Sequence, residues 1–244
     1  MNTNIYYKYS DIGKDFTIVL LHGCGQNISM MEPIGKFYYD YFNILEIDLP
    51  GFGKSDEPNY VWSVFDYAKA INILIKKLKI KEVIMIGHSF GGKIALAYAS
   101  KYKTYKLICF ASPYCSEMTK LSFKTKIYKK LKKINMLKPL AKLMSKKIGS
   151  TDYKNASMIM RGVLVKSINI DMIDDIKKIN CPTLLIWGDK DTAVPLKRAY
   201  ELNNLIHDSA VIVYKEKTHY AYLEELDKTI KILDSFFKIK RKDL

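Results

Sequence analysis

Residues 83–92 read VIMIGHSFGG, in which four apolar residues lead directly into a Gly-x-Ser-x-Gly motif. Three of the four apolar residues are β-branched, and a helix-like segment follows at residues 93–101. A buried strand, a tight turn and a helix in this order form the context in which the motif predicts an exposed, strained serine. Gly87 and Gly91 would then be required, because a side chain at either position would collide with the neighbouring strand or helix.

On these residues the chain resembles the α/β-hydrolase family. The resemblance implies an α/β fold with a mostly parallel, doubly wound sheet and an inserted helical cap. It also implies that Ser89 is the nucleophile and that the backbone N–H of Phe90 supplies half of an oxyanion hole. A serine at a helix N-terminus lies where free N–H groups favour negative charge.

A short edge strand is predicted at residues 5–9. The second predicted strand, at residues 16–21, is a nearly continuous apolar run that ends in the sequence HGCGQ. In the resembled family a His-Gly pair at this place opens the loop that supplies the other oxyanion donor, which by position is the N–H of Cys24. A nucleophilic role for Cys24 is the alternative, and it is disfavoured because Ser89 already occupies the nucleophile's context. We expect His22 to bond the loop backbone.

A third strand is predicted at residues 42–47, followed by the turn-rich loop DLPGFGKS at residues 48–55. The resembled family has a very similar loop, which packs beside the entrance to the active site. Nucleotide binding is the alternative interpretation, but only the Gly-Lys-Ser end of a P-loop is present. An amphipathic helix is predicted at residues 67–78.

A buried strand at residues 106–111 precedes a long segment, residues 116–178, that we interpret as helical pieces with lysines outside. This segment is too long for a single crossover between strands. It fits the cap that the resembled family inserts here, so we predict a core of residues 1–115 and 179–244 and a cap of residues 116–178. Extra helices with no gating role remain an alternative.

The acid and the base are expected after the last two strands, at residues 183–187 and 210–214. The resemblance implies an acid three residues beyond Gly188, which is Asp191, with Asp189 as the alternative. It implies that His219, in a loop before a terminal helix at residues 222–237, is the base. The chain order Ser, Asp, His is the order of this fold.

These three residue types supply separate parts of one chemistry. A serine hydroxyl needs a base to remove its proton, a histidine can do so near neutral pH, and a carboxylate orients the histidine. We therefore predict a serine hydrolase that cleaves a small-molecule ester or thioester through an acyl-enzyme, with no cofactor and no metal. Carbon–carbon bond hydrolysis and perhydrolysis by the same triad, and a non-catalytic small-molecule receptor, are the alternatives.

The net charge of +15 is uneven along the 244 residues. Residues 116–180 contain 16 basic and 5 acidic residues, and the remainder contains 24 and 20. A basic cap can attract an anionic substrate or membrane surface, although compositional drift is the favoured explanation of the excess. Nucleic acid is not expected, because no binding motif is present and arginine is scarce.

Neither a membrane span nor a secretory signal is visible in the sequence, and the four cysteines are scattered without metal-ligand spacing. We therefore expect a cytoplasmic protein with free thiols.

Overall fold

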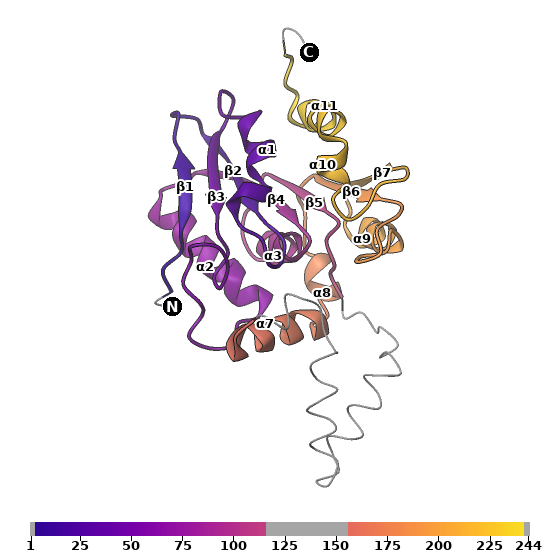
Figure 1. Ribbon diagram of the computed structural model, residues 1–244. Helices are drawn as coiled ribbons and strands as arrows, with labels where there is room; N and C mark the ends of the chain where they lie inside the picture. The colour runs from indigo at the N-terminus through magenta and orange to yellow at the C-terminus, as the bar shows by residue number, and fades with distance from the viewer. Residues whose placement is uncertain (1–2, 116–155, 242–244) are drawn as a thin grey trace.

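The structure is a computed structural model that describes residues 3–115 and 156–241. A seven-stranded sheet runs through the middle of the fold, with helices on both faces (Figure 1). The strands are β1 (Tyr7–Ser10), β2 (Phe16–Leu21), β3 (Asn43–Ile47), β4 (Glu82–His88), β5 (Lys106–Phe110), β6 (Thr183–Gly188) and β7 (Ser209–Tyr214).

The strand order is β1-β3-β2-β4-β5-β6-β7, and every pair is parallel except the edge pair of β1 and β3. Strands that are covered on both faces need apolar residues at consecutive positions. The sequence FTIVLL of β2, buried at five of its six positions, is of this kind. The predicted mostly parallel, doubly wound sheet is confirmed.

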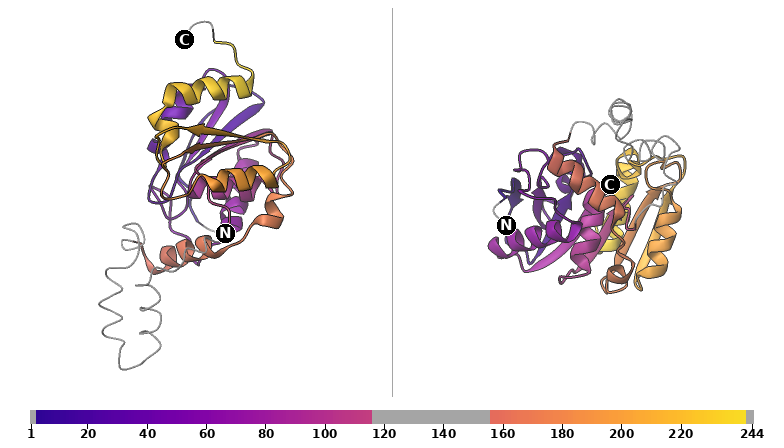
Figure 2. Two further views of the ribbon diagram at one scale, coloured as in Figure 1. Left: turned by 90° about the vertical axis from the view of Figure 1, so that its right-hand side faces the viewer. Right: turned by 90° about the horizontal axis from the view of Figure 1, so that it is seen from below.

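Helices cover the two faces of the sheet (Figure 2). They enclose two separate apolar cores. One core includes α2 (Val64–Lys77), α3 (Phe90–Ala99) and α9 (Lys197–Leu205), and the other includes α1 (Glu32–Lys36) and α11 (Leu226–Phe237). The remaining described helices are η1 (Ile28–Met30), α7 (Met158–Asn169), α8 (Ile173–Ile176) and α10 (Ala221–Glu224). No helix in the described ranges is long and apolar enough to cross a membrane.

The predicted helix at residues 67–78 begins earlier than expected, at Val64, because a capping box lies in front of it. The Ser63 hydroxyl accepts a hydrogen bond from the Asp66 N–H, and the Asp66 carboxylate accepts one from the Ser63 N–H. This reciprocal pair satisfies two N–H groups that have no partner within the helix.

The terminal helix predicted at residues 222–237 is divided, with α10 and α11 separated by Glu225. Glu225 has φ −126° and ψ 50°, outside the helical region. The carboxylate of Glu224 bonds the Thr218 N–H, and Glu225 lies 2.7 Å from the ammonium group of Lys217. No glycine or proline marks this break, so the sequence pattern alone did not predict it. The short elements η1 and α1 were not predicted either.

Most of the predicted cap, residues 116–155, lies outside the described residues. The described remainder of the predicted cap contains α7 and α8.

The junction of β4 and α3 is packed so closely that two positions tolerate no side chain. A Cβ atom on Gly87 would lie 2.5 Å from the carbonyl oxygen of Gly91. A Cβ atom on Gly91 would lie 2.4 Å from the carbonyl oxygens of Leu21 and His22, at the end of β2. These are backbone atoms, which cannot turn aside as the tip of a flexible side chain can.

Replacing Gly87 by alanine should therefore destabilise the fold by about 3 kcal/mol, the upper end of typical overpacking costs. Urea unfolding of Gly87→Ala and wild type would measure this change. Gly13→Ala is the matched control, because its Cβ would meet nothing within 4 Å and only the positive φ of 75° opposes it. That control should cost about 1 kcal/mol. Equal losses in the two variants would contradict the close packing.

Candidate active site

The candidate residues lie in loops that follow three different strands of the parallel sheet. Ser89 follows β4, Asp191 follows β6 and His219 lies beyond β7. The carboxyl ends of parallel strands meet at one edge of a sheet, where ligands bind in open α/β folds. The fold therefore gathers three residues that are far apart in the sequence.

Ser89 occupies the turn between β4 and α3 with φ 52° and ψ −114°. A positive φ is costly for a residue with a Cβ, by about 1–2 kcal/mol. The Ser89 N–H donates to the carbonyl of Phe110 on the neighbouring strand at 2.9 Å, which holds the strained turn. Phe90 is the first residue of α3, so its N–H belongs to the four that have no partner within the helix.

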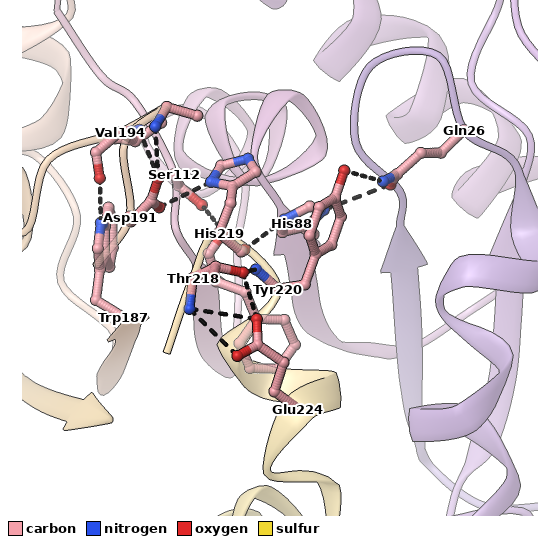
Figure 3. A network of polar contacts seen from close by, with 12 residues as sticks. Gln26, His88, Ser112, Trp187, Asp191, Val194, Thr218, His219, Tyr220 and Glu224 are labelled. Atoms are coloured by element: carbon pink, nitrogen blue, oxygen red, sulfur yellow. Dashed lines mark hydrogen bonds and ion pairs between the residues drawn. The ribbon is translucent and has the colours of Figure 1, made fainter. Parts of the chain in front are cut away.

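Asp191 and His219 form a hydrogen-bonded pair, with Nδ1 of the histidine 2.7 Å from Oδ2 of the aspartate (Figure 3). The Asp191 side chain is 0% exposed and that of His219 is 16% exposed. The other carboxylate oxygen, Oδ1, accepts the N–H groups of Ala193 and Val194, both at 2.8 Å. The loop backbone thus aims one oxygen of the acid at the histidine.

The orientation of this pair determines which ring nitrogen of His219 can take up a proton. With Nδ1–H donated to the carboxylate, the lone pair of the neutral ring lies on Nε2. The rival acid, Asp189, is exposed, and its Oδ1 accepts the N–H of Glu216 at 2.7 Å. The structure brings Asp191 to His219 and directs Asp189 into a neighbouring turn.

His22 is buried and bonds the backbone on both sides of its ring. Its Nε2 accepts the N–H of Leu49 at 2.9 Å, so the proton of the neutral ring is on Nδ1, which donates to the Gly23 carbonyl at 2.7 Å. Burial lowers the pKa of His22, in agreement with a neutral ring. In a trans peptide the C=O and the next N–H point in opposite directions. By holding the Gly23 carbonyl, His22 therefore sets the direction of the Cys24 N–H.

His88 directly precedes Ser89 in the chain, and its ring lies 4.8 Å from that of His219, centroid to centroid. Its Nε2–H donates to the backbone carbonyl of His219 at 3.1 Å. The side chain is almost completely buried, and burial lowers its pKa to about 3. A neutral His88 thus supports the backbone of the candidate base. His207, by contrast, is exposed.

Sequence reasoning missed Gln26, whose side chain joins the network shown in Figure 3. Its Oε1 accepts the Gly23 N–H at 2.8 Å, and its Nε2 donates to the Tyr220 hydroxyl at 3.3 Å. No motif position marked this residue, because its partners are a backbone group and a side chain almost two hundred residues away. Within the described ranges, no group of three or more His, Cys, Asp or Glu side chains is arranged to hold a metal ion.

The low pKa of His88 predicts a pH dependence of stability. Between about pH 6.5, where an unfolded histidine gains a proton, and about pH 3, the unfolded chain binds one more proton at this residue than the folded chain. The free energy of unfolding should therefore fall with falling pH, by about 1.4 kcal/mol per pH unit from this group. Urea unfolding between pH 7 and pH 4.5 should show a shallower slope in His88→Gln. Parallel slopes would contradict a neutral, buried His88.

Comparison with protein families matches residues 17–113 to the family described as the alpha/beta hydrolase fold. A pimeloyl-(acyl-carrier protein) methyl ester esterase of Aliivibrio fischeri (strain MJ11) is 24% identical, over 97% of this chain and 98% of the relative. The AB hydrolase superfamily protein YisY of Bacillus subtilis (strain 168) is 26% identical, over 93% of each chain.

Solved structures agree with this assignment of the fold. The esterase EaEST from Exiguobacterium antarcticum superimposes with a TM-score of 0.75 at 24% identity, covering 97% of this chain and 96% of the esterase. A bacterial membrane phospholipase A superimposes with a TM-score of 0.77 at 20% identity, covering 97% and 83% of the two chains. Together with the sheet order and the strained serine turn, these matches show that the chain has the α/β-hydrolase fold.

Proposed function

We propose that the protein hydrolyses a carboxylic ester or thioester through an acyl-enzyme intermediate. In this proposal Ser89 is the nucleophile, His219 is the general base and acid, and Asp191 orients the histidine. The backbone N–H groups of Cys24 and Phe90 form the oxyanion hole. The observation that carries the proposal is the 2.7 Å contact between Asp191 and His219 at the edge of the sheet where Ser89 occupies its strained turn.

The reaction follows from these roles. The Ser89 Oγ attacks the carbonyl carbon while Nε2 of His219 accepts the hydroxyl proton. The carbonyl π electrons move onto oxygen, and two N–H groups stabilise the resulting oxyanion, each by about 3–4 kcal/mol. Collapse of the intermediate breaks the bond to the alcohol or thiol, which leaves with the proton from His219. Water then attacks the acyl-enzyme in the same way, releasing the carboxylic acid and restoring Ser89.

The substrate class rests on the relatives as well as on the chemistry. The relative from Aliivibrio fischeri is named for the methyl ester of pimeloyl-(acyl-carrier protein), which supports a carboxylic ester as the substrate class. Carbon–carbon bond hydrolysis and perhydrolysis would use the same three residues and remain alternative reactions. A non-catalytic receptor remains the alternative from another class of protein, and loss of a triad residue would have favoured it.

We also propose that residues 116–178 form a cap over the site, as the sequence predicts. The contacts of α7 support this proposal, because Met160 fills the space beside Gly51 that a Cβ atom would need. At the other end of α7, the Lys93 ammonium group of α3 donates to the Ser167 carbonyl at 2.7 Å. These contacts attach α7 to the loop after β3 and to α3, the helix that follows Ser89.

The basic residues of the proposed cap lie mainly at positions 116–155, outside the described residues. An anionic substrate or membrane surface as a partner therefore remains a prediction based on charge. A cytoplasmic location likewise remains a prediction.

Ser89→Ala should abolish labelling by a fluorophosphonate probe and lower kcat for p-nitrophenyl esters by about 10⁶-fold if the triad acts as a unit. The reason is that no other group in the proposal can form the acyl-enzyme. Gel fluorescence with peptide mapping would locate the label, and ester assays from acetate to palmitate would measure the rate. Labelling of Cys24, or undiminished labelling of the variant, would refute the assignment of Ser89.

Asp191→Asn should reduce kcat by about 10⁴-fold, because an amide can hold the histidine in the wrong tautomer. Asp189→Asn is the matched control, since the same change there affects an exposed acid that bonds the Glu216 N–H. It should leave kcat within about twofold of wild type, in line with a surface substitution. A larger loss in the Asp189 variant than in the Asp191 variant would reverse the assignment of the acid.

A further inference from the structure

The side chain of Gln26 connects the loop that carries Cys24 with the loop that carries His219. Its amide has a definite orientation, because the Gly23 N–H can only donate and therefore faces Oε1, at 2.8 Å. The NH₂ group then faces the hydroxyl of Tyr220, at 3.3 Å. Tyr220 directly follows His219 in the chain.

Gly23 is held on both of its backbone groups. Its carbonyl accepts from Nδ1 of His22 at 2.7 Å, and its N–H donates to Gln26 at 2.8 Å. The Gly23 N–H is thus already bound to Gln26, and the proposed oxyanion donor of this loop is the next N–H, that of Cys24. The direction of the Cys24 N–H depends on both of these hydrogen bonds, because both constrain the backbone at Gly23.

The packing around Gly23 also involves the Gln26 side chain. A Cβ atom on Gly23 would lie 2.8 Å from Oε1 of Gln26 and 2.9 Å from Nδ1 of His88. The Gln26 oxygen also lies 3.4 Å from Nδ1 of His88, whose other nitrogen donates to the His219 carbonyl. Gln26 and His88 therefore pack together between the two loops, in the space left by the absent side chain of Gly23.

We propose that Gln26 is a positioning residue of the oxyanion hole. Its side chain binds the Gly23 N–H and the Tyr220 hydroxyl at once. It thereby fixes the position of the Cys24 N–H relative to the loop that carries His219. This inference rests on the proposed function, since it assigns a role within the same site. Gln26 itself forms no bond to the reacting atoms.

The expected loss of activity on removing Gln26 can be estimated from the effect of displacing one oxyanion donor. Complete removal of one oxyanion donor typically costs about 10²–10³-fold in kcat. A donor that remains but moves by a fraction of an ångström costs less, so loss of Gln26 should lower kcat/KM by about 10- to 100-fold.

The test is Gln26→Met, which retains the length of the side chain but removes both hydrogen bonds. Two inhibitors separate positioning from general loosening of the site. A trifluoromethyl alkyl ketone adds the Ser89 Oγ to its carbonyl carbon and places the negative oxygen in the oxyanion hole, with the serine proton on His219. The matching methyl ketone binds without this addition, as a ground-state analogue.

We expect Gln26→Met to raise the Ki of the trifluoromethyl ketone by about the same factor as it lowers kcat/KM for p-nitrophenyl butyrate. The Ki of the methyl ketone should change by less than about twofold. A merely structural role would weaken the binding of both inhibitors together, and that result would overturn the proposal.

Asn27→Ala is the matched control from the same loop. Asn27 accepts the Ser29 N–H at 3.0 Å, so the variant also removes a side-chain acceptor from a backbone N–H, on the side of η1. It should retain wild-type kinetics within about twofold, and an equal loss in both variants would overturn the specific role of Gln26.

A wild-type protein that neither hydrolyses the ester nor forms the ketone adduct would refute the proposed function together with the inference. An active wild type with an equally active Gln26→Met would refute the inference alone.

Discussion

The close approach of three backbones at Gly87 and Gly91 is the constraint on which the rest of the structure depends. The end of β2, the end of β4 and the start of α3 meet without any side chain between them. Such contact forces the chain to reverse within one residue, and Ser89 takes the positive φ that this reversal requires. The same contact brings the loop after β2 beside the N-terminus of α3. The strained serine and the two proposed oxyanion donors are therefore consequences of one packing arrangement.

Around this junction the side chains are oriented mainly by backbone groups. Two loop N–H groups hold the carboxylate of Asp191, His22 bonds a carbonyl and an N–H, and His88 donates to the carbonyl of His219. Each bond is buried or partly buried, where a polar group left without a partner costs about 1–3 kcal/mol. Alternative rotamers are therefore unfavourable. A site built in this way can hold its geometry even though its members come from separate loops, which is the preorganisation that oxyanion chemistry requires.

Much of the fold was predictable because its signals are local. The apolar runs of β2 and β6 reflect strands covered on both faces, and the Gly-x-Ser-x-Gly turn reflects a steric requirement within five residues. The division between α10 and α11 was not predictable, because Glu225 leaves the helical region without any breaker residue. The roles of Gln26 and His88 were missed for a related reason. Their partners are set by the packing of distant loops, and a glutamine or histidine in a loop has many uses.

By itself, the sequence determined the succession of the strands and of the longer helices of the core, the place of the strained serine and the candidates for acid and base. It could do so because turn sterics and strand burial act on neighbouring residues. Only the tertiary structure decided between Asp189 and Asp191 as the partner of His219, since both follow β6 and differ by two positions. It also decided which N–H of the loop after β2 is already bound to a side chain. Both questions concern distances of about 3 Å between segments far apart in the chain, and such distances are set by packing of the whole domain.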